Sequence, residues 1–113
     1  MSNQADQVFD ALGQPVRRRI VELLRVGPAP VGKLARELPV GRPAVSKHLK
    51  LLDDAGITMH RTLGTSNVYW LRPEGLEAAR NWLTEAWDNV LAGYAQAAHR
   101  ESQSGRRRSN GTR

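Results

Sequence analysis

Residues 42–52 constrain the fold of this chain more than any other stretch. Their apolar members, Val45, Leu49 and Leu52, recur at the spacing of a helix face, so one side of this segment must pack on a core. The other side carries hydrogen-bond donors, and no carboxylate occurs before Asp53. A short helix that is apolar on one side and cationic on the other suits the major groove of DNA, which admits one helix and displays base-edge acceptors. Taken alone, the segment is also compatible with a basic helix that is merely solvated.

The residues before this segment predict a second helix and a tight turn. The apolar pattern over about residues 31–38 is helical, and Pro39 stops that helix. Residues 39–41, Pro-Val-Gly, then form a tight turn, and Pro43 is tolerated in the first turn of the next helix, which Gly56 closes. A helix, a short turn containing glycine and a second helix together have the sequence form of a helix-turn-helix.

A β-hairpin is predicted directly after this motif. Residues 57–63 and 67–71 are strand-like runs, and the loop Gly64-Thr65-Ser66 joins them. The second run has strong β character because it contains Val-Tyr-Trp at 68–70. A hairpin that follows a helix-turn-helix is a wing.

Helices are also predicted over residues 4–12, from Pro15 to about Arg25, and from Pro73 to about His99. Within the second of these, residues 17–19 are three consecutive arginines that span nearly a full turn, so their side chains cannot all point one way. We expect one or two of them to lie along the surface and pair with acids such as Glu22.

The last predicted helix carries a broad apolar stripe. On a domain this small, the stripe would expose too much apolar surface unless a second copy of the chain covered it. We therefore expect a homodimer seam formed by the first and last helices; the alternative is a helix that packs within its own chain and leaves its aromatic residues half exposed. The expected seam residues are Val8, Leu12, Leu76, Trp82, Leu83, Trp87, Val90, Leu91 and Tyr94.

The charge of the chain is unevenly distributed. The net charge is +6, and residues 14–72 hold eleven basic residues against four acidic ones, which gives +7 for that segment. Residues 73–101 hold two basic and five acidic residues, a net −3. This asymmetry fits a body that lies on a polyanion. We expect one domain over residues 1–101, followed by a basic tail, residues 102–113, that has no apolar residue and is disordered.

Composition also excludes several classes of function. The chain has no cysteine, which excludes disulfides and thiolate metal sites. It has no Gly-rich phosphate loop and no His–acid pair placed around a pocket, so we expect neither an enzyme nor a cofactor. With no secretory signal and no apolar run of membrane-spanning length, the expected location is the cytoplasm, with no membrane partner, and the Arg- and Ala-rich composition suggests a bacterial source.

These segments, in this order, resemble a known family. Residues 11–24, Ala-Leu-Gly-Gln-Pro-Val-Arg-Arg-Arg-Ile-Val-Glu-Leu-Leu, are similar to the opening of ArsR-type winged helix-turn-helix repressors. Residues 31–38 and 42–52, with Ala55-Gly56, resemble the helix-turn-helix of that family and its turn into the wing. The resemblance covers about residues 5–99. It implies a mainly α fold with a small β-hairpin, four helices before the hairpin and one after it, dimeric through the first and last helices. The function that it implies is a DNA-binding transcriptional repressor, often of its own operon.

Metal-sensing members of the family bind metal through Cys pairs on the third helix or through Asp, His and Glu sets on the last helix. In this chain Leu34 and Arg36 stand near the Cys positions, give or take one residue. On the last helix the candidate ligands are Asp88, His99 and Glu101, and they show no repeated His–acid spacing. The resemblance therefore points to the subgroup that lacks metal ligands, and we expect no metal site.

The predicted recognition helix runs over residues 42–55. Arg42 is expected to read guanine as a bidentate donor, with Ser46 one turn further on the same face, and two lysines to contact phosphates. Pro43 and Ala44 are placed to touch a thymine methyl, whereas His48 is equally suited to a DNA contact or to a hydrogen bond that fixes the helix. The predicted DNA-binding residues are Arg42, Pro43, Ala44, Ser46, Lys47, His48, Lys50, Arg61, Thr65, Ser66 and Asn67.

The tip of the predicted wing is neutral, where relatives often carry basic residues. Arg61 is its nearest cation, and we hypothesise that the arginines at 106–108 compensate for the weaker phosphate contacts of the wing. Two other functions stay open from the sequence. The chain could be a winged-helix module whose basic face binds an acidic protein. It could also be a repressor that responds to a small-molecule inducer in an apolar site at the dimer seam, near Trp82, Trp87 and Tyr94, although no sequence feature supports an inducer directly.

Overall fold

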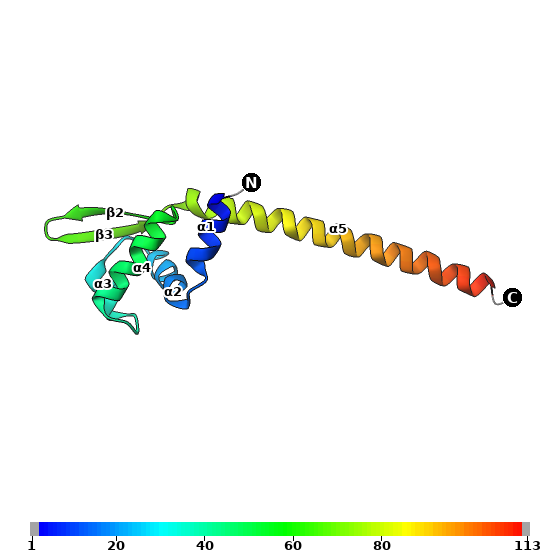
Figure 1. The fold of residues 1–113 in the computed structure, drawn as a ribbon, viewed down its shortest axis with the longest axis horizontal. Coiled ribbons are helices and arrows are strands. Elements are labelled where there is room, and N and C mark those ends of the chain that lie inside the picture. The colour runs from blue at the N-terminus through cyan, green and yellow to red at the C-terminus, as the bar shows by residue number, and fades with distance from the viewer. Residues whose placement is uncertain (1–2, 112–113) are drawn as a thin grey trace. The chain divides into compact units, whose positions relative to one another are not determined.

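A computed structural model describes the backbone of residues 3–111 and the side chains of residues 4–103. The chain divides into two compact units, one ending at Arg80 and the other beginning at Asn81. The order of elements is α1 (Asn3–Leu12), α2 (Pro15–Leu24), β1 (Ala29–Pro30), α3 (Val31–Arg36), α4 (Arg42–Asp54), β2 (Thr58–Leu63), β3 (Ser66–Leu71) and α5 (Pro73–Gly111) (Figure 1). This order confirms the predicted winged helix-turn-helix.

The sheet has one strand more than the sequence predicted. Its order is β1-β3-β2, and both pairs are antiparallel, with Ala29 opposite Tyr69 and Pro30 opposite Val68. Strand β1 has only two residues, one of them proline, so it is too short for an alternation of apolar and polar residues to predict it. It joins the start of α3 to the wing and thereby holds the helix-turn-helix against the sheet.

The hairpin turn is tighter than expected. Leu63 pairs with Ser66, so the connection is the two-residue turn Gly64-Thr65 rather than a three-residue loop. Gly64 has φ +62°, a value that the first position of such a Gly-X turn requires. Ser66 therefore belongs to β3 and not to the wing tip.

One core joins the helices of the first unit to the sheet. Ile20 of α2, Leu34 of α3 and Leu49 of α4 are almost completely buried together with Ile57, which precedes β2. These positions follow the helical periodicity of the sequence, because burial of the apolar stripes is what brings short helices together.

The junction between α4 and α5 depends on two glycines. Gly56 ends α4 with φ +79°, a left-handed conformation typical of glycine at this position. The backbone N–H of Arg72 donates to the carbonyl of Ile57 at 2.8 Å. The first turn of α5 lies so close that a Cβ atom on Gly75 would stand 1.8 Å from the carbonyl oxygen of Gly56. Sequence periodicity gave no sign of this contact.

Two helix ends differ from the predictions. Helix α3 ends at Arg36 rather than near residue 38, and α5 continues to Gly111 rather than ending near His99. The backbone of residues 102–111 is therefore helical where we expected a disordered tail: a lack of apolar residues removes the means to build a core, but it does not break a helix. The side chains of Arg106, Arg107 and Arg108, and all of residues 112–113, lie outside the described part of the structure, so their expected role is not tested. Among the described residues, no helix is both long enough and apolar enough to cross a membrane.

Candidate nucleic-acid interface

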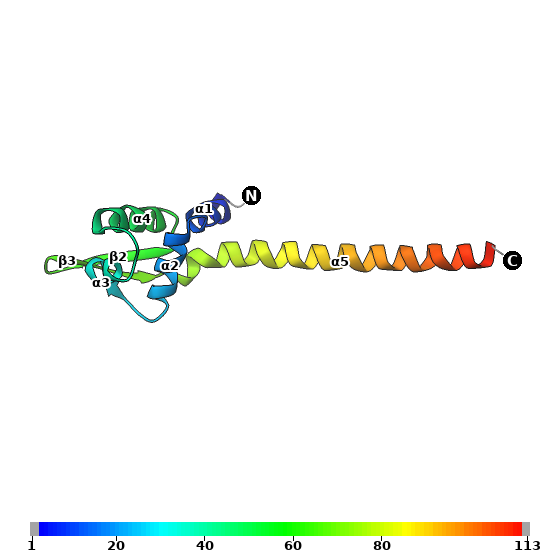
Figure 2. The same ribbon diagram turned by 90° about the horizontal axis from the view of Figure 1, so that it is seen from below.

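Helix α4 presents a polar, cationic face opposite its buried side. Val45, Leu49 and Leu52 are completely buried, which fixes the rotation of the helix about its axis. Both Figure 1 and Figure 2 show α4 beside the hairpin of β2 and β3, with which it is in contact. The predicted contact residues divide by exposure. Arg42, Pro43, Ser46, Lys47 and Lys50 are exposed, and Ala44 and His48 are partly buried.

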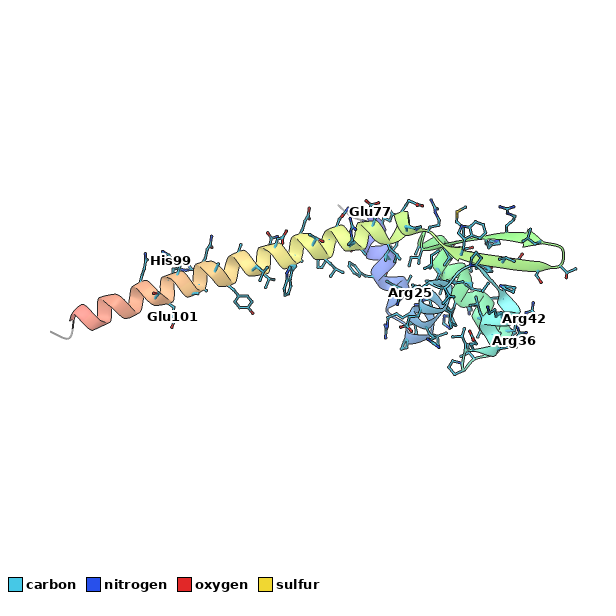
Figure 3. The ribbon with its side chains drawn as sticks, turned by 180° about the vertical axis from the view of Figure 1, so that it is seen from behind. Arg25, Arg36, Arg42, Glu77, His99 and Glu101 are labelled. Carbon is cyan, nitrogen blue, oxygen red and sulfur yellow. The ribbon has the colours of Figure 1, made fainter. Side chains whose placement is uncertain are left out.

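The side chain of Arg42 lies against the preceding helix. A Cβ atom built on Gly32, in the first turn of α3, would lie 3.8 Å from Nη1 of Arg42. Figure 3 shows Arg42 and Arg36 in the same region of the molecule, where α3 ends and α4 begins. Arg42 therefore extends from the first position of α4 toward the first turn of α3, within van der Waals distance of a Cβ built on Gly32.

The two lysines of α4 are held weakly or not at all. Lys50 forms an ion pair with Asp54 one turn away, with Nζ 3.2 Å from Oδ2. Both side chains are more than half exposed, so the pair contributes only a few tenths of a kcal/mol, roughly 0.3–0.5, to stability. Lys50 can exchange this partner for a phosphate at little cost, and Lys47 is exposed on the same face.

The three consecutive arginines of α2 have structural partners. Arg19 pairs with Glu22, as predicted, with Nη1 3.2 Å from Oε2. Arg18 donates to the carbonyl of Leu12 at 2.6 Å. Arg17 donates through Nε to the carbonyl of Ala11, so two of the three arginines satisfy carbonyl groups at the end of α1.

Arg17 also reaches α4. Its Nη1 lies 3.2 Å from Nδ1 of His48, and a further bond joins its Nη2 to the carbonyl of Asp10 at 3.3 Å. The pKa of His48 is lowered, first by burial and then by the positive charges of Arg17 and Lys47. The neutral form of His48 is therefore favoured, and no local sequence pattern indicated its link to Arg17, which is 31 residues away.

This lowered pKa predicts a pH-dependent contribution to stability. Because the folded state binds the proton of His48 less readily than the unfolded chain does, the contribution is fully present above the unfolded pKa of about 6.5. It is lost as the pH falls through 6.5 toward the lower folded value. The free energy of unfolding of wild type relative to His48→Gln should therefore shrink between pH 7.5 and pH 5 in urea titrations. A difference that stayed constant or grew over this range would contradict the assignment.

The wing contributes an exposed arginine and a neutral tip. Arg61, Thr65 and Asn67 are exposed, whereas Ser66 is half-buried because it lies within β3. The hydroxyl of Thr62 donates to Oδ1 of Asn67 at 2.7 Å, which engages the amide oxygen across the hairpin. Arg61 is thus the cation of the wing, as the sequence predicted.

A polar cluster that the sequence analysis missed ties the wing to α4. Asp53, in the last turn of α4, accepts hydrogen bonds from the hydroxyl of Thr58 and from Nδ1 of His60, the latter at 2.5 Å. The ring of His60 stacks on Tyr69, with ring centroids 4.8 Å apart. Burial, with the nearby charge of Asp53, raises the pKa of Tyr69. These bonds fix the base of the wing relative to the end of α4.

Comparison with known proteins agrees with this geometry. The protein family described as "Helix-turn-helix domain" matches residues 12–61. The HTH-type transcriptional regulator Rv2034 of Mycobacterium tuberculosis is 52% identical over 91 residues, which cover 80% of this chain and 85% of that protein. The transcriptional repressor SdpR of Bacillus subtilis is 31% identical, over 69% of this chain and 87% of its own length.

Solved structures give a further comparison. The crystal structure of an ArsR family transcriptional regulator superposes with a TM-score of 0.74 at 29% identity, over 80% of this chain and 93% of that one. This chain belongs to the ArsR family of winged helix-turn-helix transcriptional regulators. The homodimeric DNA-binding fragment of Mb0332 from Mycobacterium bovis matches with a TM-score of 0.61 and 28% identity, over 80% of this chain and 79% of that one. The ArsR-family chain is accordingly a DNA-binding transcriptional regulator and not an enzyme.

The positions at which metal-sensing ArsR members carry ligands hold other groups here. Leu34 is 1% exposed in the core, and Arg36 is exposed at the end of α3. On α5, His99 and Glu101 point to different sides of the helix (Figure 3), and Nε2 of His99 lies 3.0 Å from the amide nitrogen of Gln103. Within the described residues, no three His, Cys, Asp or Glu side chains gather closely enough to hold a metal ion.

The apolar stripe predicted on the last helix of this ArsR chain is open to solvent within one chain. Trp87 is 63% exposed, Tyr94 71% and Val90 46%, and Trp82, Leu83 and Leu91 are each about half exposed. Leu12 and Leu76 are partly buried against the core. Val8, which we expected at the dimer seam, is completely buried in the core of its own unit, because α1 packs that side chain inward. Its side chain therefore does not face a partner.

Proposed function

We propose that this ArsR-family chain is a homodimeric repressor that binds an imperfect inverted repeat in DNA, with α4 in the major groove. The observation that carries the proposal is the set of exposed hydrogen-bond donors on α4, namely Arg42, Ser46, Lys47 and Lys50, on a helix whose orientation is fixed by three buried apolar residues. The major groove accommodates one helix and offers acceptors that match these donors. The repressor role is supported by the name of SdpR, which is a transcriptional repressor.

The exposed stripe of α5 supports the homodimer. Leu83 and Val90 are seven residues apart and each about half exposed, with Trp87 and Tyr94, also seven apart, beside them. A seven-residue repeat of apolar side chains is typical of helices that pair along one seam. The related Mb0332 fragment is homodimeric. Two-fold symmetry would place two α4 helices about one turn of DNA apart, which is why the operator should be an inverted repeat.

The roles of the site residues follow from their positions. Arg42, at the start of α4, reads guanine, and Ser46 lies one turn further along the same face. Lys47, Lys50 and, from the wing, Arg61 bind phosphates and set the position of the dimer on the duplex. Pro43 and Ala44 contact a thymine methyl. The wing residues Thr65, Ser66 and Asn67 add weak polar contacts because they carry no charge.

The Arg42→Ala variant tests the base-reading role. It should lose about 1–3 kcal/mol of specific binding and relax the sequence preference at a single position of each half-site. Binding to random DNA should change far less. The measurement is a fluorescence-anisotropy titration of operator and random duplexes at one fixed salt concentration. An equal loss on both duplexes would make Arg42 a phosphate contact instead.

The function itself is tested with DNA from upstream of the gene for this chain. Anisotropy with excess non-specific competitor should show retained binding, and footprinting should then reveal an inverted repeat. A reporter driven by that promoter should be less active when the chain is produced. Binding that falls to the level of random DNA would contradict self-regulation, and a more active reporter would contradict repression.

We also propose that the chain belongs to the subgroup of the family that lacks metal ligands. This rests on Leu34 in the core and on the divergent directions of His99 and Glu101. Operator affinity should then be the same with added Zn²⁺ as with a chelator. A zinc-dependent release of the operator would contradict the assignment.

A further inference from the structure

Arg17 joins three elements through one guanidinium group. From α2 it donates to the carbonyls of Asp10 and Ala11 at the end of α1, and its Nη1 lies 3.2 Å from Nδ1 of His48 on α4. His48 is partly buried, beside the exposed cationic face of α4. Arg17 itself is partly buried, so its side chain is confined by these partners and does not extend into solvent.

The chemistry of this contact determines the proton position on His48. A guanidinium group has donors and no acceptor, and it stays charged at any pH at which the protein folds. Nδ1 of His48 must therefore accept the bond with its lone pair. In a neutral imidazole whose Nδ1 is an acceptor, the ring proton is on Nε2, which becomes a donor. The lowered pKa of His48, caused by burial and by Arg17 and Lys47, agrees with a neutral ring.

We infer that Arg17 is a positioning residue for DNA recognition: it holds His48 in the Nε2–H form and orientation, so that Nε2 donates to an acceptor on a base of the operator. This inference rests on the proposed function of α4 as the recognition helix. His48 can then have both of the roles predicted for it. Nδ1 accepts the hydrogen bond from Arg17, which fixes the ring, and Nε2 donates to DNA. Arg17 touches no DNA in this arrangement and acts through His48.

Arg18 provides a matched control for Arg17. It is the next residue of α2, carries the same charge and also donates to a carbonyl at the end of α1, that of Leu12. The structure gives it no contact with His48. Arg17→Met and Arg18→Met therefore both remove one positive charge and the hydrogen bonds to carbonyl groups at the end of α1. Only Arg17→Met also removes the contact with His48 on α4.

The first readout is the protonation of the imidazole in the free protein, from long-range ¹H–¹⁵N correlation spectra at pH 7.5. In wild type and in Arg18→Met, His48 should show a bare Nδ1 and a protonated Nε2. In Arg17→Met the spectrum should shift toward a mixture of the two neutral forms. Arg17→Lys, which restores a donor without an acceptor, should recover part of the wild-type signature. An unchanged His48 spectrum in Arg17→Met would overturn the inference.

The second readout is the ratio of affinities for operator and random DNA. The operator is the duplex that wild-type protein enriches from a random pool, and affinities are measured at one salt concentration. Arg17→Met should lower this ratio by at least about fivefold, the lower end of what one base contact provides, and Arg18→Met should leave it unchanged. Urea titrations of both variants show whether each is folded under the assay conditions.

A double-mutant cycle separates action through His48 from a general structural effect. In a His48→Ala background, Arg17→Met should cause no further loss in the affinity ratio. An equal loss with and without His48 would overturn the inference while leaving the proposed function intact. A wild-type chain that enriches no sequence from the pool would instead overturn the proposed function, and the inference with it.

Discussion

Replacing Gly75 with alanine is expected to destabilise the first unit by roughly 3 kcal/mol, at the upper end of what overpacking costs. A Cβ at this position would stand 1.8 Å from the carbonyl oxygen of Gly56 and 3.1 Å from Cα of Ile57. Both obstacles are backbone atoms, so no side chain can rotate to make room. The first turn of α5 must move away from the α4–β2 junction, and that movement strains the hydrogen bond from Arg72 to Ile57.

The measurement is thermal unfolding at one protein concentration, and the melting temperature should fall by about 10 °C or more. Gly93→Ala is the matched control, because Gly93 lies in the same helix and a Cβ added there would meet no described atom within 4 Å beyond the neighbouring backbone of the helix itself. That substitution should be neutral or stabilise the helix by up to about 1 kcal/mol, since alanine has the higher helix propensity. A Gly75→Ala protein as stable as wild type would contradict the close contact between the first turn of α5 and the carbonyl group of Gly56.

Replacing Val90 with glutamate is expected to dissociate the proposed dimer and to lower affinity for the inverted repeat by about a hundredfold or more. Val90 is 46% exposed in a single chain and lies within the apolar stripe of α5. In a dimer its side chain would be covered, and an unpaired carboxylate there would lose its hydration on both protomers. Each separated chain would still bind one half-site, but the gain from binding two half-sites at once would be lost.

Sedimentation velocity gives the oligomeric state, and anisotropy on full and half operators gives the affinities. Ala92→Glu is the control: it introduces the same charge two residues later, about 200° around the helix and therefore away from the stripe. Ala92 is exposed, and its variant should remain dimeric with an affinity for the inverted repeat close to that of wild type. A Val90→Glu protein that sedimented as a dimer would place the seam elsewhere.

Most of the elements of this fold could be predicted from local patterns. The bounds of α4, Arg42–Asp54, agree closely with the predicted helix, because Pro43 marks its start, Gly56 its end and three apolar residues its buried side. The wing strands were also predicted within a residue at each end, since β-branched and aromatic residues flank a glycine turn. Strand β1 could not be predicted, because two residues carry no period and pair only when β3 lies beside them.

In the candidate site, too, local sequence predicts some features and the tertiary structure decides the others. The type and order of its side chains, with Arg42, Ser46, Lys47 and Lys50 on one face, can be read from residues 42–50 alone. The partners of those side chains cannot. Asp53 binds Thr58 and His60 across the helix–strand junction, and Val8 turns inward although its spacing suited a seam. The wing contributes Arg61 as expected, while Ser66 became part of a strand when the turn closed one residue earlier.

The sequence by itself determined the helix-turn-helix, the wing and the cationic face of α4, because each depends on residues that are close along the chain. Helical and strand periods, glycine turns and proline starts all act over a few residues, and the apolar stripes leave only one way to bury them together. Only the tertiary structure decided the contacts between residues far apart: Arg17 with His48, 31 positions away, and Gly75 on the carbonyl of Gly56. These contacts arise from the packing of whole elements, and the same side chains would look unremarkable in any local window. In the folded chain, Arg17 of the arginine run contacts His48 on α4. Gly75, in the first turn of α5, lies so close to the carbonyl of Gly56 that no larger residue fits there.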